Sequence, residues 1–262
     1  MPLGAAREEP LLAGDEPAPY RVVNPRGQSP MLLTCDHASH AVPKSLGGLG
    51  VEPRHLTRHI GWDPGARDVA LRLSERFDAP AVLSGYSRLV IDCNRRPGSA
   101  TSIPEISDRT IVPGNVGLDP EDAQRRLDSL FRPYHQAIAD ALDAMERKGL
   151  EPAYVAVHTF TPELAGFRRP WHLGVLWDQD ARVARPLIEA LRANPGLCVG
   201  DNQPYSGRDH FDFSQGHHAT SRGLPTALVE IRSDLVRGSR GMARHADLLG
   251  DALERVLATL SR

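Results

Sequence analysis

Short apolar runs that alternate with longer segments of helical periodicity are the feature that most constrains how this chain folds. The runs are mostly continuous rather than alternating, and strands that are covered on both faces have this pattern. Such strands, interspersed with helices, predict an α/β fold: a three-layer α/β/α sandwich with a mixed, largely parallel sheet. The predicted strands are residues 31–35, 81–83, 89–91, 154–157, 173–177, 197–199 and 226–231.

Caps and apolar periodicity predict the helices. An Asp-Pro pair opens each of the segments 63–77 and 119–149, and proline is favoured at the first helical position. Pro133 is expected to kink or split the second segment, because it lacks a backbone N–H donor. A third helix has apolar residues at steps of three and four over 242–260, and a weaker one is expected around 182–192.

The chain has 262 residues, no internal repeat and no linker between two cores, so a single catalytic domain is expected over 21–262. Residues 1–20 are rich in Ala, Pro, Glu and Gly without periodicity, which indicates a loose, flexible leader. The segment 95–118 also lacks periodicity, and loops of this length are usually functional or disordered.

Composition excludes several classes of partner. The chain has 31 Lys and Arg against 33 Asp and Glu, for a net charge of −2, whereas nucleic-acid binders usually carry a strongly basic face. No apolar run approaches the ~20 residues that span a bilayer, and the start MPLGAAREEP lacks the features of a secretory signal. With three cysteines and no disulfide framework, a cytoplasmic protein with neither nucleic-acid nor membrane partners is expected.

Polar clusters follow four of the apolar runs, at the strand ends where ligands gather in α/β sheets. The clusters begin at Asp36-His37, at Asp92, at His158 and at Glu230. Histidine and carboxylate without a thiolate cluster suit a catalytic Zn²⁺, which lowers the pKa of bound water towards ~7 and polarises a carbonyl. A separate carboxylate would act as general base, and arginines would bind a substrate carboxylate and the oxyanion. These parts predict a metal-dependent amide hydrolase for a small acidic substrate.

Other catalytic chemistries fit less well. The chain lacks the G-x-S-x-G nucleophile elbow, the G-x-x-x-x-G-K-[ST] phosphate loop and an early G-x-G-x-x-G dinucleotide motif. Cys35 stands beside Asp36-His37, but it lies within an apolar run and is better explained as a small buried side chain than as a nucleophile.

The polar clusters belong to six longer motifs, which occur in the order TCDHASHAVP, HIGWDPGARDVA, YSRLVIDCNR, VHTFTP, NQPYSG and VEIRSDL. Together they resemble the N-formylglutamate amidohydrolase family, from about Tyr20 to the C-terminus. That family is similar in fold to zinc carboxypeptidases and aspartoacylases, which implies an α/β sandwich of the phosphorylase/hydrolase type with a metal site at the strand ends.

The resemblance implies a set of metal ligands. His37 matches the first histidine of the superfamily, and His158 matches a later histidine that follows a central strand. The wider superfamily has an H-x-x-E motif at the first ligand, but here His40 stands in place of the glutamate. Asp63 is the preferred second ligand and His40 the alternative, although Asp63 is also explained by helix capping.

The resemblance also implies catalytic and substrate-binding roles. Glu230 corresponds to a late glutamate that acts as base, and Arg88 to an arginine at the oxyanion. Asn94 and Arg95 match the D-x-N-R residues that hold the substrate carboxylate in aspartoacylases, and Arg232 is a further substrate-binding candidate. The roles of His59, Trp62, His172, Asn202 and Tyr205 stay open.

These inferences lead to one principal hypothesis: a hydrolase with one Zn²⁺ per chain that cleaves the amide bond of N-formyl-L-glutamate or a similar small N-acyl amino acid. One alternative keeps the metal and changes the substrate to another N-acyl amino acid or a peptide. The other alternative is an inactive, ligand-binding homologue, which only the missing H-x-x-E glutamate supports. The oligomeric state is left open.

Overall fold

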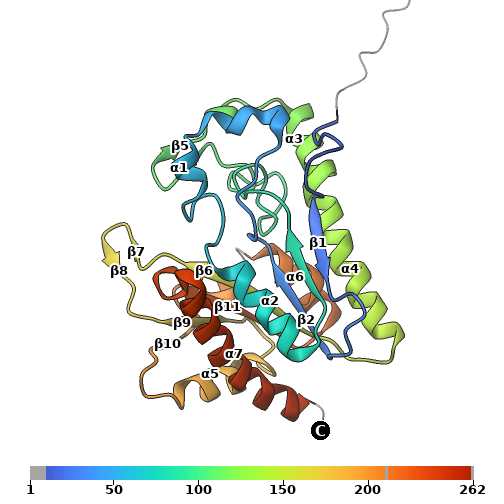
Figure 1. Cartoon of the computed structure of the whole chain (residues 1–262), viewed down its shortest axis with the longest axis vertical. Helices are drawn as coiled ribbons and strands as arrows, with labels where there is room; N and C mark the ends of the chain where they lie inside the picture. The colour runs from blue at the N-terminus through green and yellow to red at the C-terminus, as the bar shows by residue number, and fades with distance from the viewer. Residues whose placement is uncertain (1–9, 210–211, 261–262) are drawn as a thin grey trace, which may run out of the picture.

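A seven-stranded sheet forms the centre of the computed structural model, which describes residues 10–209 and 212–260 (Figure 1). The strand order is β1-β3-β2-β6-β11-β9-β10. Strands β2, β3, β6 and β11 run parallel, β1 is antiparallel to β3, and the parallel pair β9–β10 is antiparallel to β11. The sheet is therefore mixed and largely parallel, as predicted. Its strands are β1 (Tyr20–Val23), β2 (Met31–Cys35), β3 (Ala81–Ser84), β6 (Ala153–Phe160), β9 (Leu173–Leu176), β10 (Val199–Asp201) and β11 (Thr226–Arg232).

Helices cover both faces of the sheet, which confirms the three-layer sandwich. On one face α2 (Ala66–Phe77), α5 (Ala184–Arg192) and α7 (Gly238–Leu260) pack on alternate strand residues such as Leu33. On the other face α4 (Arg132–Arg147) packs on the intervening residues such as Leu32, and the short α6 (Phe213–His218) lies beside it. Leu32 and Leu33 are thus both fully buried although they face opposite sides of the sheet, which explains why β2 is continuously apolar.

The helix expected over 119–149 is divided into three parts. Helix α3 (Pro120–Arg126) is followed by a π-helical turn (Leu127–Phe131) and then by α4. Pro133 stands in the first turn of α4, where its missing N–H removes the hydrogen bond to the preceding turn. The π-helical turn directly before α4 interrupts the α-helix close to Pro133, in line with the prediction that Pro133 kinks or splits it.

Two strand predictions need correction. Residues 89–91 form no strand, because their apolar side chains are buried in a third cluster beside the sheet, together with Leu11 and Phe131. Strand β1 was not expected, since it is a partly buried edge strand without a continuous apolar run.

The predicted leader is packed in part of its second half. Residues 1–9 lie outside the described residues, but Leu11 is buried in the third apolar cluster, and the Tyr86 hydroxyl donates a hydrogen bond to the Pro17 carbonyl at 2.7 Å. Leu11 is therefore packed against the domain, although most of residues 13–18 are exposed, and the expected loose segment does not extend through Leu11.

Two small hairpins project beside the sheet (Figure 1). The segment 95–118 contains β4 (Ile106–Ser107) and β5 (Thr110–Ile111), and the segment after β6 contains β7 (Glu163–Leu164) and β8 (Phe167–Arg168). The remaining short elements are α1 (Pro53–Leu56) and the 3-10 helices Lys44–Gly50, Pro113–Asn115, Gly207–Asp209, Thr220–Arg222 and Ser233–Val236. Within the described part of the chain, none of the helices combines the length and apolar character needed to cross a membrane.

Candidate active site

Three segments distant in the sequence meet at the carboxyl ends of β2, β6 and β11. His37 follows β2, His158 lies near the end of β6, and Glu230 is paired with His158 in the register of β11 and β6. Asp63 is brought to them by its backbone N–H, which donates to the His37 carbonyl at 2.9 Å. Gly65, not Asp63, is the N-cap residue of α2, so the carboxylate of Asp63 does not cap this helix.

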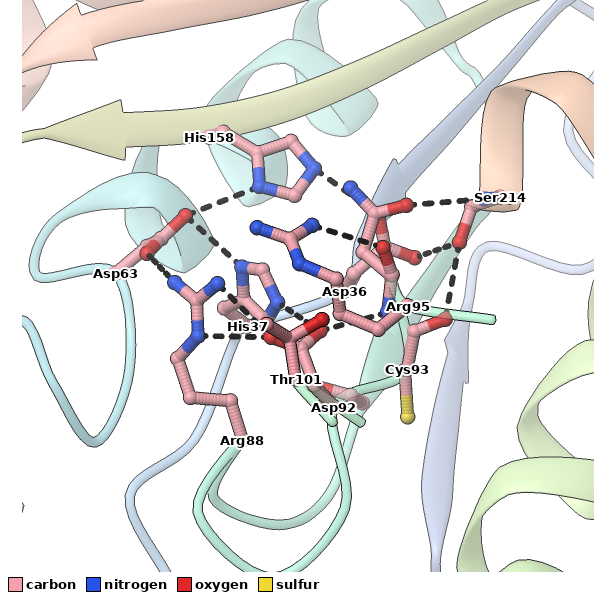
Figure 2. A network of polar contacts seen from close by, with 12 residues as sticks. Asp36, His37, Asp63, Arg88, Asp92, Cys93, Arg95, Thr101, His158 and Ser214 are labelled. Atoms are coloured by element: carbon pink, nitrogen blue, oxygen red, sulfur yellow. Dashed lines mark hydrogen bonds and ion pairs between the residues drawn. The ribbon is translucent and has the colours of Figure 1, made fainter. Parts of the chain in front are cut away.

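The Asp63 carboxylate faces both histidines (Figure 2). Its Oδ2 lies 3.3 Å from Nδ1 of His37 and 3.0 Å from Nδ1 of His158, and it also accepts a hydrogen bond from the backbone N–H of Thr159 at 3.2 Å. All three side chains are buried, and one ligand atom from each lies within 4.8 Å of the other two. This His-Asp-His group could hold a metal ion.

Each histidine is fixed from behind by another buried carboxylate. Nε2 of His37 lies 2.8 Å from Oδ1 of Asp92, and Nε2 of His158 lies 3.0 Å from Oδ2 of Asp36. Both nitrogens of each ring therefore face a carboxylate, which only accepts hydrogen bonds when ionised. With a metal ion at Nδ1, each Nε2 would carry the proton and donate it to the outer carboxylate. Histidines that bind metals are oriented by outer carboxylates in this way.

The two outer carboxylates are themselves held by neighbouring groups. Oδ1 of Asp36 accepts hydrogen bonds from the hydroxyls of Tyr134, at 2.8 Å, and Ser214, at 2.7 Å. Oδ2 of Asp92 accepts from Nε and Nη2 of Arg88, at 3.0 and 2.9 Å. The orientation of both imidazole rings is therefore determined by a connected network rather than by single contacts.

The charges of this network require two further positive charges. Asp36, Asp63 and Asp92 carry three negative charges in the interior, and Arg88 supplies one positive charge. In the neutral form, the Nδ1 lone pairs of both histidines would point at the Asp63 oxygen and be repelled by it. Protonation of both rings, or one divalent cation among the three ligands, removes this repulsion. The donor set therefore fits a divalent metal ion.

The pKa of His158 reflects this environment. Burial disfavours the charged ring, but hydrogen bonds to Asp36 and Asp63 outweigh the burial and raise its pKa well above the usual value. A metal ion at this position would replace the proton that these carboxylates stabilise.

Glu230 differs from the other carboxylates of the site. Its side chain is buried, and Oε2 has no hydrogen-bond partner among the described residues. Burial raises the pKa of Glu230 to about 7. A carboxylate with a free oxygen and a pKa near neutrality is suited to accept and donate a proton.

A cavity of about 1060 Å³ lies beside the carboxylate–histidine network; Arg88 and Asp92 of the network line it, whereas His37, Asp63, His158 and Glu230 are not among its lining residues. His59 also lines it, and His59 Nδ1 lies 3.5 Å from Oδ1 of Asp63. Both projecting hairpins contribute to its walls, including Ile106 and Leu164. The other cationic side chains along it are Arg58, Arg95, Arg109 and Arg237. The lining thus has more arginines than carboxylates, which are Asp92, Asp108 and Glu163, and it reaches the buried network at Arg88 and Asp92.

A family model decides the relationship of this chain to known proteins. The model described as FGase, N-formylglutamate amidohydrolase, matches residues 29–237, which include every residue of the network. The chain belongs to the N-formylglutamate amidohydrolase family. It is therefore a hydrolase of amide C–N bonds, and the predicted resemblance is confirmed.

Individual relatives of this amidohydrolase agree with the family assignment. The chain is 27% identical over 219 residues to the N-formylglutamate deformylase of Pseudomonas putida, and the match covers 78% of each protein. It is similar to the crystal structure of gene product Atu2144 from Agrobacterium tumefaciens, with a TM-score of 0.93, 32% identity and coverage of 96% of this chain and 100% of that one. The N-formylglutamate amidohydrolase from Ralstonia eutropha has the same fold, with a TM-score of 0.68, 20% identity and coverage of 94% and 99%.

The structure brings most of the predicted site residues of the amidohydrolase together. His37, Asp63 and His158 form the His-Asp-His group, Glu230 lies on the strand beside His158, and Arg88 contacts both Asp63 and Asp92. His40, the alternative ligand, is exposed and packs against Trp62, outside this group.

Two residues that were predicted to bind substrate, Arg232 and Asn94, make structural contacts instead. Arg232 is bound to Asp234, at 2.8 Å, and to the backbone carbonyls of residues 169–171, so it holds a loop and does not line the cavity. Asn94 is buried, and its Oδ1 accepts a hydrogen bond from the backbone N–H of Ser214 at 2.9 Å. Both side chains are occupied by structural contacts. Arg95 lines the cavity, and its Nη1 also donates a hydrogen bond to the Asn94 carbonyl at 2.9 Å.

Sequence reasoning assigned no role to Asp36 or Asp92. A signal was present, since each lies in a polar cluster at the end of an apolar run and Asp36 directly precedes His37. Their function depends on contacts across 122 and 55 residues, which a single sequence does not reveal.

Proposed function

We propose that this chain hydrolyses the amide bond of N-formyl-L-glutamate, or of a closely similar N-acyl acidic amino acid, at a zinc site held by His37, Asp63 and His158. The observation that carries the proposal is the orientation of both imidazole rings, whose Nδ1 atoms meet one oxygen of Asp63 at 3.3 and 3.0 Å. Glu230, with its free Oε2, lies on the adjacent strand.

The protein residues divide the reaction among themselves. When bound, the metal ion would polarise the amide carbonyl and lower the pKa of water. Glu230 accepts a proton from the water that attacks the formyl carbon, and it delivers a proton to the nitrogen as the C–N bond breaks. Formate and the free amino acid are released. Arg88, held by Asp92, places its positive charge beside the oxygen that becomes negative.

Substrate recognition is proposed to depend on the cationic lining of the cavity. Arg95 lines the cavity and can pair with a carboxylate of the substrate through two parallel N–H···O bonds. Acidic N-acyl amino acids carry two carboxylates, and the arginines of the lining outnumber its carboxylates. Arg88 is paired with Asp92 and Arg58 with Asp108, while Arg95, Arg109 and Arg237 also line the cavity. The names of the matched family and of the Pseudomonas putida relative support glutamate as the amino acid.

The inactive-homologue alternative loses its only support. It depended on His40 standing where the superfamily has a ligating glutamate. In the proposed site Asp63 would supply the carboxylate instead, from the loop that precedes α2.

Metal analysis combined with a formate-release assay tests the proposal. The purified protein should contain close to one zinc per chain and release formate from N-formyl-L-glutamate. A chelator should abolish the activity, and added zinc should restore it. His158→Ala should deplete the metal, whereas His172→Ala should retain it, because Nδ1 of His172 accepts a hydrogen bond from Cys198 away from the site.

Two results would contradict the proposal. A wild-type protein that neither contains zinc nor gains formate release on zinc addition is no zinc hydrolase of this substrate. Full metal retention in His158→Ala would show that the ligands are placed incorrectly.

A further inference from the structure

Tyr205 lines the same cavity as Arg88, yet the proposed mechanism gives it no role. Its side chain comes from the loop that follows β10, and the residue is 38% exposed. The loop belongs to the NQPYSG motif, which the sequence singles out without a function. The position of this phenol can be derived from its neighbours.

Hydrogen bonds and a close backbone approach hold the loop against the strand next to Glu230. Asn202 Oδ1 accepts hydrogen bonds from the backbone N–H groups of Trp177, at 2.9 Å, and Gly207, at 3.1 Å. Gly174 on β9 pairs with Glu230 on β11, and the loop backbone lies so close to Gly174 that a Cβ there would collide with the Gln203 carbonyl. Gly174 therefore allows the loop to lie directly over the strand next to the proposed base.

Arg169 lies behind Tyr205 in the wall of the site. It is 5% exposed, and its Nη2 donates a hydrogen bond to the Tyr205 hydroxyl at 3.0 Å. The guanidinium also lies over the rings of Phe160, at 5.6 Å, and Tyr205, at 4.9 Å, and donates to the Thr161 carbonyl at 3.3 Å. This guanidinium makes its polar contacts with Thr161 and with the Tyr205 hydroxyl, so its positive charge lies directly beside the phenol.

The contact with Arg169 determines what the hydroxyl can do. Because the phenol oxygen accepts from Arg169, its own proton is available for another acceptor, and the guanidinium polarises the O–H bond. Burial and Glu230 raise the pKa of Tyr205, while Arg169 and Arg88 lower it. The net effect is a raised pKa, so the phenol stays protonated. Tyr205 lines the cavity together with Arg88, and its loop lies over Gly174, the strand neighbour of Glu230.

We propose that Tyr205 donates a hydrogen bond to the acyl oxygen of the scissile amide as negative charge develops there, and that Arg169 is a positioning residue for this hydroxyl. The inference rests on the proposed function. The acyl oxygen is favoured over a substrate carboxylate because the reacting carbonyl must lie beside the water that Glu230 deprotonates. Tyr205 and Arg88 would then supply two donors to one oxyanion.

Steady-state kinetics with N-formyl-L-glutamate test the inference. Tyr205→Phe should lower kcat by roughly 10²–10³-fold, the usual loss for one oxyanion donor, with little change in KM and unchanged zinc content. Tyr86→Phe is the matched control, because its hydroxyl bonds to the Pro17 carbonyl outside the cavity, and it should retain wild-type kcat.

A double-mutant cycle tests the role of Arg169. Arg169→Met should lower kcat in the wild-type background but have almost no further effect in the Tyr205→Phe background. A purely structural role for Arg169 would give the same loss in both backgrounds and would overturn the positioning role.

The remaining outcomes distinguish failure of the role of Tyr205 from failure of the proposed function. An active wild type with unchanged kcat in Tyr205→Phe overturns the inference alone, and so does a raised KM with constant kcat, which would place the hydroxyl on a substrate carboxylate. A wild type without activity on N-formyl-L-glutamate overturns the proposed function and the inference together.

Discussion

Replacing His218 by glutamine should make the protein lose less stability on acidification than the wild type loses. His218 on α6 and His135 on α4 are both buried, with Nε2 of His218 2.8 Å from Nδ1 of His135. Nε2 of His135 lies 2.8 Å from the Cys93 carbonyl, which only accepts, so this nitrogen carries the proton. His135 Nδ1 is then the acceptor and His218 Nε2–H the donor, and both contacts are satisfied with two neutral rings.

Protonation of this pair is opposed by the fold. Burial lowers the pKa of His135 to about 4 and that of His218 to about 3. The unfolded chain takes up a proton at each ring near an ordinary pKa of about 6.5, so below that pH it binds more protons than the folded chain. The free energy of unfolding therefore falls with falling pH. Between about pH 7.5 and about pH 5, each histidine lowers it by about 2 kcal/mol.

Urea unfolding at several pH values measures the effect. In His218→Gln the glutamine amide can still donate to His135, but one titrating group is gone. The variant should lose about 2 kcal/mol less than the wild type between about pH 7.5 and about pH 5. The control is Ile138→Val on α4, a buried position, which should lower stability by about 1 kcal/mol at every pH. Parallel pH profiles for His218→Gln and the wild type would refute the reasoning.

Three further predictions concern the active site. Glu230→Gln should retain zinc and lower kcat by roughly 10²–10⁴-fold, as expected for loss of a general base; normal turnover would remove Glu230 from the mechanism. Asp36→Asn keeps the shape but removes the negative charge behind His158, so chelator competition should show a roughly 10–100-fold weaker zinc affinity, and unchanged affinity would deny it an orienting role. Arg95→Ala should raise KM for N-formyl-L-glutamate more than for N-formyl-L-leucine, which lacks the second carboxylate; equal effects would indicate a structural role.

The fold could be predicted largely from the sequence because its strands are buried on both faces. Strands such as β2 and β11 have almost no polar residue before their carboxyl ends. The apolar run in the sequence therefore indicates the strand, and the polar residues that follow it indicate the edge of the sheet where the ligand site lies. The same signal failed for residues 89–91, because burial in the third apolar cluster produces an apolar run as readily as burial in a sheet. It also missed β1, whose pairing with β3 depends on position rather than composition.

The candidate site could be predicted in part, and its limits have a physical cause. The positions of His37, His158 and Glu230 follow from strand ends, which parallel pairing brings to one edge. Arg232 lies in the same kind of position, but its guanidinium reaches Asp234 and the loop carbonyls instead of the cavity. The direction of a long side chain depends on which partners are within reach, and a sequence does not contain those distances.

The network behind the histidines also explains how the two layers of the sandwich cooperate in the site. Asp36 is held by Tyr134 from α4 and Ser214 from α6, on one face of the sheet. Asp63 arrives with the loop that leads into α2, on the opposite face. His158 on the central strand β6 contacts both carboxylates, at 3.0 Å each. A shift of either helical layer against the sheet would therefore change one of the two contacts that orient this ring, so correct packing of both layers is a condition for the chemistry at the sheet edge.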